Sequence, residues 1–121
     1  MILTPDTRAR LGDLLREYEP TYTVPIRVEQ LQLTRRRFTK GAAETERTFL
    51  EVEVSVAQPE SEPQHWLLSL DFDEDAGNLL GEGAQEADLR TAALIISANI
   101  DEWWQCKDHE AATAAIGKRL S

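Results

Sequence analysis

The chain has 121 residues, with 22 Asp and Glu against 13 Lys and Arg and a formal net charge of -9. This length is enough for a hydrophobic core without staples, and we expect a single domain over residues 1–121. One cysteine excludes an internal disulfide and favours a cytoplasmic protein, and we expect neither a signal peptide nor a membrane helix of roughly 18–20 apolar residues. The acidic balance disfavours phosphate backbones and acidic membranes as general partners.

The first segment, TPDTRARLGDLLREYEP, predicts a helix over about residues 5–18. Thr4 is a good N-cap, Pro5 suits the first helical position, and Pro20 ends the pattern. Apolar residues recur at helical spacing and form one stripe, made of Leu11, Leu14, Leu15 and Tyr18.

Three following segments predict an antiparallel meander with one solvated face. FLEVEVSV (49–56) and HWLLSLDF (65–72) alternate apolar and polar residues, as a half-buried strand requires. In the preceding segment the alternation changes phase between Val28 and Leu31. This change predicts either a bulge near Glu29–Gln30 or a strand that is covered on both faces.

The segment EADLRTAALIISANIDEWWQ predicts a long helix, with Asp88 as its N-cap and a broad apolar stripe. DHEAATAAIGKRL (108–120) is predicted as a second, alanine-rich helix that covers the other side of the long one. The expected fold class is therefore α+β: a three-stranded meander packed against an N-terminal helix and a C-terminal helix pair, in the order α-β-β-β-α-α and in two layers.

A basic segment, RRRFTK, lies at or near the expected tip of the first hairpin. One hypothesis makes it a finger that contacts nucleic acid or an acidic partner, with an aromatic ring that stacks on a base. The other makes it a solvated turn whose cations pair with Glu44, Glu46 and Glu51 across the hairpin. The residues concerned are Arg35, Arg36, Arg37, Phe38 and Lys40.

An acidic segment, DFDEDAGNLLGE, matches part of a calcium-binding loop. Carboxylates stand at loop positions 1, 3, 5 and 12, but the glycine needed at position 6 is replaced by Ala76. The alternative is a solvated acidic turn that leaves the third strand. The weak candidate ligands are Asp71, Asp73, Asp75 and Glu82, and no metal or other cofactor is expected.

No nucleophile motif, phosphate-binding glycine loop or dinucleotide fingerprint is present in the sequence, which favours a non-enzymatic role. We expect a small acidic protein-binding module of the adaptor, immunity, chaperone or inhibitor type, which covers the surface of a protein partner. A basic partner would meet the sheet face through Arg27, Glu29, Glu51 and Glu53, and self-association is a further expectation. The alternatives are nucleic-acid binding through the basic tip and calcium regulation through the acidic loop.

Overall fold

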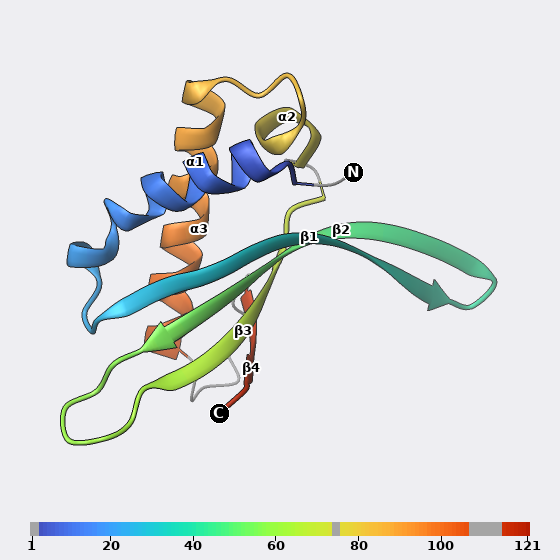
Figure 1. Ribbon diagram of the computed structural model, residues 1–121. Coiled ribbons are helices and arrows are strands. Elements are labelled where there is room, and N and C mark those ends of the chain that lie inside the picture. Colours follow the sequence, from blue (N-terminus) through green and yellow to red (C-terminus); the bar gives the residue numbers. More distant parts are fainter. Residues whose placement is uncertain (1–2, 74–75, 107–114) are drawn as a thin grey trace.

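The computed structural model describes residues 3–73, 76–106 and 115–121 of an α+β fold (Figure 1). An antiparallel sheet in the order β1-β2-β3-β4 forms one layer, and the helices pack against one of its faces. The elements in chain order are α1 (Pro5–Arg16), a 3-10 turn (Glu19–Thr21), β1 (Ile26–Lys40), β2 (Ala43–Val56), β3 (Gln64–Asp71), α2 (Ala76–Leu80), α3 (Glu86–Cys106) and β4 (Ala115–Arg119). The predicted fold class is confirmed, with a short fourth strand added to the sheet.

The first helix forms as the sequence predicts. The Thr4 hydroxyl accepts a hydrogen bond from the Thr7 amide at 3.2 Å, and Pro5 occupies the first turn. Three leucines of the stripe, Leu11, Leu14 and Leu15, are fully buried. The helix ends at Arg16, two residues before the predicted boundary.

The sheet core comes from the alternating residues of the central strands. Leu50, Val52, Val54 and Val56 of β2 are all 0% exposed, and Leu68, Leu70 and Phe72 join them from β3 and its end. In β1 the pairing register with β2 shifts between Val28 and Gln30, so the predicted bulge is confirmed.

The β1–β2 hairpin extends far beyond the rest of the sheet. β2 pairs with β3 only from Phe49 to Val56, whereas its pairing with β1 continues to Lys40 opposite Ala43. Residues 35–47, called the ribbon below, therefore project as two strands, and no third strand of the described residues lies beside them (Figure 1). Gly41 has φ of 65° at the first position of the two-residue turn, which suits a type II′ hairpin.

The long helix α3 buries most of the predicted stripe, and the last member of that stripe, Trp104, is partly buried against the core. The fully buried members are Leu89, Ala92, Ala93, Ile96, Ile100 and Trp103. Its start differs from the prediction. Asp88 is inside the first turn, and its carboxylate accepts a hydrogen bond from the Gln85 amide at 2.9 Å. This is the reaching-back half of a capping box rather than an N-cap, and it still supports the helix start.

The predicted last helix is wrong over residues 115–119, which form β4; residues 108–114 of the same prediction lie outside the described residues. β4 pairs antiparallel with β3, from Trp66 opposite Arg119 to Leu70 opposite Ala115. The physical reason is that β3 would otherwise present an unpaired edge, and the backbone of β4 satisfies it. The helix-pair cover expected on α3 is not seen at Leu94, which is 55% exposed.

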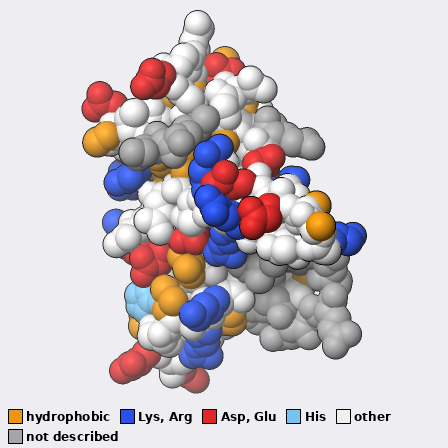
Figure 2. Space-filling view, turned by 90° about the vertical axis from the view of Figure 1, so that its right-hand side faces the viewer, with side chains coloured by type: hydrophobic (Ala, Val, Ile, Leu, Met, Phe, Trp, Pro, Cys, Tyr) orange, Lys and Arg blue, Asp and Glu red, His pale blue; other side chains and the backbone are white. Residues whose placement is uncertain are grey.

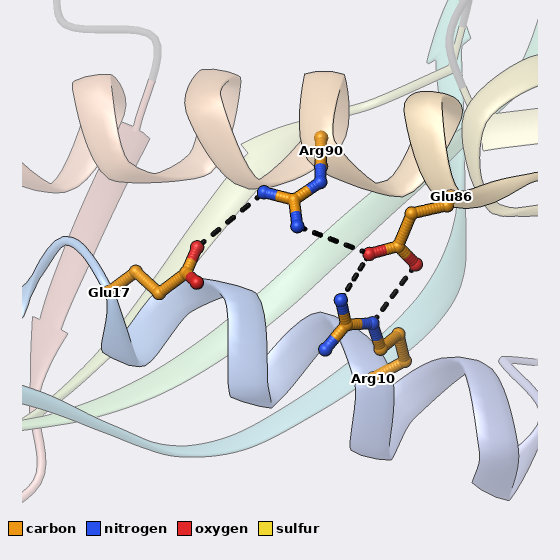
Figure 3. A network of polar contacts seen from close by, with 4 residues as sticks. All are labelled: Arg10, Glu17, Glu86 and Arg90. Carbon is orange, nitrogen blue, oxygen red and sulfur yellow. Dashed lines mark hydrogen bonds and ion pairs between the residues drawn. The ribbon is translucent and has the colours of Figure 1, made fainter.

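Exposed charges connect the two helices that cover the sheet (Figure 3). Glu86 of α3 accepts two hydrogen bonds from the Arg10 guanidinium of α1, and Arg90 lies 3.5 Å from Glu86 and 3.7 Å from Glu17. The hydrogen bond from Arg10 lowers the pKa of the Glu86 carboxyl, helped by the charges of Arg10 and Arg90. These exposed contacts join α1 to α3, while the buried leucines of α1 hold the helix on the core.

Candidate binding surface

The ribbon carries charge of the opposite sign to the rest of the chain. It holds five of the 13 Lys and Arg residues and only two of the 22 Asp and Glu residues. All of its residues from 35 to 46 are exposed. Seen from the side to which the ribbon projects, Lys and Arg side chains run down the middle of the face, with Asp and Glu side chains next to them (Figure 2).

Arg36 is the one arginine of the triad that is held on the sheet. Its guanidinium donates to the Glu51 carboxylate at 3.0 Å and to the Ser69 hydroxyl at 3.1 Å, which joins three strands. It also lies 5.1 Å from the centre of the Phe49 ring, at cation–π distance. The Arg36 side chain is therefore engaged within the sheet, so its contribution to any partner contact is reduced.

Arg35 and Arg37 point to the opposite face of the ribbon, since side chains alternate along a strand. Arg35 is 3.9 Å from Glu46, an exposed pair at the limit of an ion pair. Arg37 is opposite Glu46 in the register, yet among the described residues neither Arg37 nor Lys40 has an ion pair. The neutralisation hypothesis thus holds for Arg35 and Arg36 and leaves Arg37 and Lys40 with unpaired positive charge.

Phe38 is 44% exposed near the ribbon tip. Its ring centre is 5.9 Å from that of Phe49, with the planes tilted by 53°, so one edge of the ring is packed and the rest faces solvent. An exposed aromatic ring beside cations is typical of a contact surface for a macromolecule.

The predicted sheet-face residues share one side of the sheet, but they differ in exposure. Glu51 accepts hydrogen bonds from Gln32 and Arg36, and its side chain is only 11% exposed. Burial alone would raise the pKa of Glu51, but these two donors and the charge of Arg36 outweigh it, so its pKa lies below the ordinary value. Our expectation that Glu51 is solvated is therefore wrong, because Arg36 and Gln32 cover it.

Of the other members of this face, Arg27 and Glu29 are exposed. Glu29, at the bulge, accepts a hydrogen bond from the Ser55 hydroxyl at 2.8 Å and lies 4.0 Å from Arg27. Glu53 is half-buried and has no ion pair in the part of the chain that the structure describes. Contact between these three residues and a basic partner stays a prediction.

Two carboxylates of the acidic loop accept hydrogen bonds from backbone amides, one in β2 and one in the loop itself. Asp73 accepts from the Thr48 amide at 2.8 Å, and Asp71 accepts from the Asp73 amide at 3.2 Å. Asp71 also forms an ion pair with Arg47 at 2.9 Å. Glu82 is exposed beyond α2.

Asp75 lies outside the described residues, so the proposed ligand set is only partly visible. Within the described ranges no group of three or more metal-ligating side chains comes together. The carboxylates of Asp71 and Asp73 instead connect the base of the ribbon to the end of β3. Calcium binding by the loop stays a prediction.

Two clefts adjoin β1. A cleft of about 700 Å³ lies where the strand begins, among Pro20, Val24, Pro25, Arg27 and Pro63. A second cleft of about 270 Å³ separates the middle of β1 from α1. Both are therefore next to the sheet edge rather than in the core.

Sequence reasoning missed three residues that support the ribbon: Arg47, Phe49 and Ser69. The sequence did carry a signal for the first two, because a two-residue turn at Gly41 fixes the register of the hairpin. That register places Arg47 opposite Arg36 and Phe49 opposite Thr34. Ser69 needs the alignment of a third strand, which no local pattern specifies.

Comparisons with protein families, with characterised proteins and with solved structures each find no match to this chain. In the described part of the chain, no helix has the length and apolar character needed to cross a membrane. Any functional conclusion therefore depends on the surface described above.

Proposed function

We propose that the protein is a non-catalytic binding module that covers the surface of an acidic protein partner with its ribbon. The observation that carries this proposal is the projection of a positively charged two-stranded ribbon from an otherwise acidic molecule. The proposal refines the expectation of a protein-binding module by moving the contact from the sheet face to the ribbon.

The ribbon has little structural reason to be so long. Ordering a residue costs roughly 1–2 kcal/mol of backbone entropy, and a two-stranded hairpin alone is marginally stable in water. Its residues from 35 to 46 are exposed, so they add little core burial. Exposed ion pairs such as Arg35–Glu46 contribute only about 0–1 kcal/mol each. A contact with another molecule would account for the projecting residues.

The charges indicate the chemistry of the partner. Arg37 lies on one face of the ribbon and Lys40 on the other, and neither has an ion pair among the described residues, so a partner that receives the ribbon in a groove would meet a cation on each side. Arginine and exposed aromatic rings are enriched at protein interfaces. The partner groove would be lined by carboxylates.

Nucleic acid is the second candidate, because a two-stranded ribbon has the width that the major groove of DNA admits. Two observations weigh against it. Only Arg37 and Lys40 among the ribbon cations lack an ion pair or a sheet contact in the described residues, so few phosphates would be neutralised. The surrounding acidic surface would also repel the rest of the nucleic-acid backbone.

A charge-reversal experiment tests the proposal. The ribbon variant combines Arg37→Glu and Lys40→Glu. A control variant combines Lys118→Glu and Arg119→Glu, which gives the same net charge with the changes elsewhere on the exposed surface. Both are compared with the wild type as baits in native lysate, with and without nuclease.

Proteins that the wild type and the control variant retain after nuclease treatment, and that the ribbon variant loses, would support the proposal. Retention that disappears with nuclease would favour nucleic acid, and a labelled oligonucleotide near 50 mM salt would then show the same loss in the ribbon variant. Equal retention by all three baits would refute a role for the ribbon.

A further inference from the structure

The outer side of β1 is a sheet edge that no other strand of the described residues covers. β1 stands first in the strand order, so one row of its backbone groups faces β2 and the other faces away. The Ala57 amide donates to the Pro25 carbonyl at 3.0 Å, which shows that the backbone N–H and C=O groups of Ala57 point toward β1. The Phe72 amide donates to the Thr48 carbonyl at 3.0 Å, which shows that Thr48 faces β3. These two bonds fix the alternation along β2 from both ends.

Because the direction of the backbone groups alternates along a strand, those of Glu51 point toward β1. The backbone groups of Gln32, its partner in the register, point toward β2. The neighbouring residues Leu31 and Leu33 then direct their amides and carbonyls away from the sheet. In the described part of the chain no hydrogen bond outside the strand ladders uses these groups. Such a row of free donors and acceptors is a template for another strand.

Helix α1 forms a wall opposite this edge. Between them lies the cleft of about 270 Å³, called the α1–β1 groove below, which is lined by Arg8, Ala9, Gly12 and Arg16 of α1 and residues 28–32 of β1. The groove therefore combines a strand edge with a helix face, an arrangement in which an extended peptide has backbone partners on one side and side-chain contacts on the other.

Gly12 gives the groove part of its width. A Cβ built at this position meets no heavy atom within 4 Å, so close packing does not require a glycine. Glycine inside a helix costs about 1 kcal/mol relative to alanine. The groove explains what the missing side chain provides, namely open space on the face of α1 that lies opposite the edge of β1.

The helix wall is cationic. Among the described residues the Arg8 guanidinium donates one hydrogen bond, to the Leu3 carbonyl at 3.4 Å, and Arg16 makes an exposed pair with Asp13 at 2.9 Å. An exposed pair three residues apart on a helix is worth a few tenths of a kcal/mol. A carboxylate of another molecule can therefore replace Asp13 at Arg16, and Arg8 has no carboxylate partner among the described residues.

We infer that the α1–β1 groove binds an extended acidic segment of a partner protein as an added strand beside β1. The backbone of that segment pairs with the free groups of Leu31 and Leu33, and its Asp or Glu side chains meet Arg8 and Arg16. A nucleic acid has no row of alternating amides and carbonyls at strand spacing. In parallel pairing with the β1 edge of a second copy, the triads Arg35–Arg37 of the two copies would face each other, so like charges oppose that arrangement.

The test uses the whole chain and a synthetic eight-residue peptide of alternating Val and Glu. The matched controls are the Val–Lys peptide and an acidic peptide with proline at alternate positions, which lacks half of the amides. We expect the Val–Glu peptide to bind at least about tenfold more tightly than either control in fluorescence anisotropy. Its binding should also slow amide exchange at Leu31 and Leu33 by about tenfold or more.

Two variants locate the binding. Gly12→Phe fills the groove, and Arg8→Glu with Arg16→Glu reverses the charge of its wall; each should weaken Val–Glu binding by about tenfold or more. Gly12→Ala and the pair Lys118→Glu with Arg119→Glu are the controls and should bind within about twofold of wild type at 0.15 M salt. Circular dichroism checks that each variant is folded. If Gly12→Phe does not fold, the binding of the Val–Glu peptide by the Arg8→Glu, Arg16→Glu variant alone tests the inference.

Absent binding of the Val–Glu peptide, or binding that both groove variants retain, would overturn the inference. So would unchanged exchange at Leu31 and Leu33, or tighter binding of a single-stranded oligonucleotide that competes with the peptide. The ribbon variant should bind the peptide within about twofold of wild type at 0.15 M salt. The proposal for the groove and the proposal for the ribbon can therefore be refuted independently of each other.

Discussion

Replacing Gly117 by alanine should destabilise the protein, and the sign of the effect distinguishes the observed β4 from the helix that the sequence predicts. A Cβ at Gly117 would overlap the Trp103 indole nitrogen and lie 3.1 Å from a methyl carbon of Leu68. Trp103 is 3% exposed and packs against Trp66 with ring centres 5.2 Å apart, so the indole has little room to move. Overpacking of this kind costs roughly 1–3 kcal/mol.

In a helix the same substitution would stabilise the protein by up to about 1 kcal/mol, because alanine is the better helix former. Gly12→Ala in α1 is the matched control and should give that stabilising sign, since its Cβ meets nothing within 4 Å. Urea unfolding followed by circular dichroism gives both free energies.

A double-mutant cycle checks the mechanism. In a Trp103→Leu background the indole is gone, so Gly117→Ala should cost clearly less than it does in the wild type. Unchanged or increased stability of Gly117→Ala in the wild-type background would refute the close approach of β4 to Trp103.

Three further outcomes are expected. Arg37→Gln should change the free energy of unfolding by no more than about 0.5 kcal/mol, whereas Arg36→Gln should cost about 1 kcal/mol because it breaks the contacts with Glu51 and Ser69; equal values in urea unfolding would contradict this. The folded pKa of Glu51 lies below its unfolded value near 4.5, so the ionised carboxylate stabilises the fold fully above that pH, and this contribution is lost as pH falls through the lower folded pKa. Glu51→Gln should therefore weaken the fall of the unfolding free energy at acid pH, and an unchanged pH dependence would contradict this role of Glu51. Asp73→Ala should cost about 1–2 kcal/mol by leaving the Thr48 amide unpaired, and millimolar Ca²⁺ should not raise the melting temperature of the wild type; a calcium-dependent rise that Asp73→Asn abolishes would instead establish the metal site.

Local periodicity in the sequence determined the helices and strands that bury one of their faces in the core. The stripe of Leu11, Leu14 and Leu15 predicted α1, and the alternation around Val52 predicted the central strand. The change of phase near Glu29 predicted the bulge, because a strand cannot place both sets of apolar residues on one face without an extra residue. In each case the core requires the pattern that the sequence displays.

Tertiary structure decided the features that no period encodes. Residues 35–47 alternate no apolar side chains, so only the turn at Gly41 and the pairing of β1 with β2 set the length of the ribbon. The segment around Gly117 has alanine-rich neighbours and became a strand because the edge of β3 needed a partner and Trp103 left room for no side chain. The contacts of Arg36 with Glu51 and Ser69 depend on the register of three strands, which long-range pairing fixes and local sequence does not.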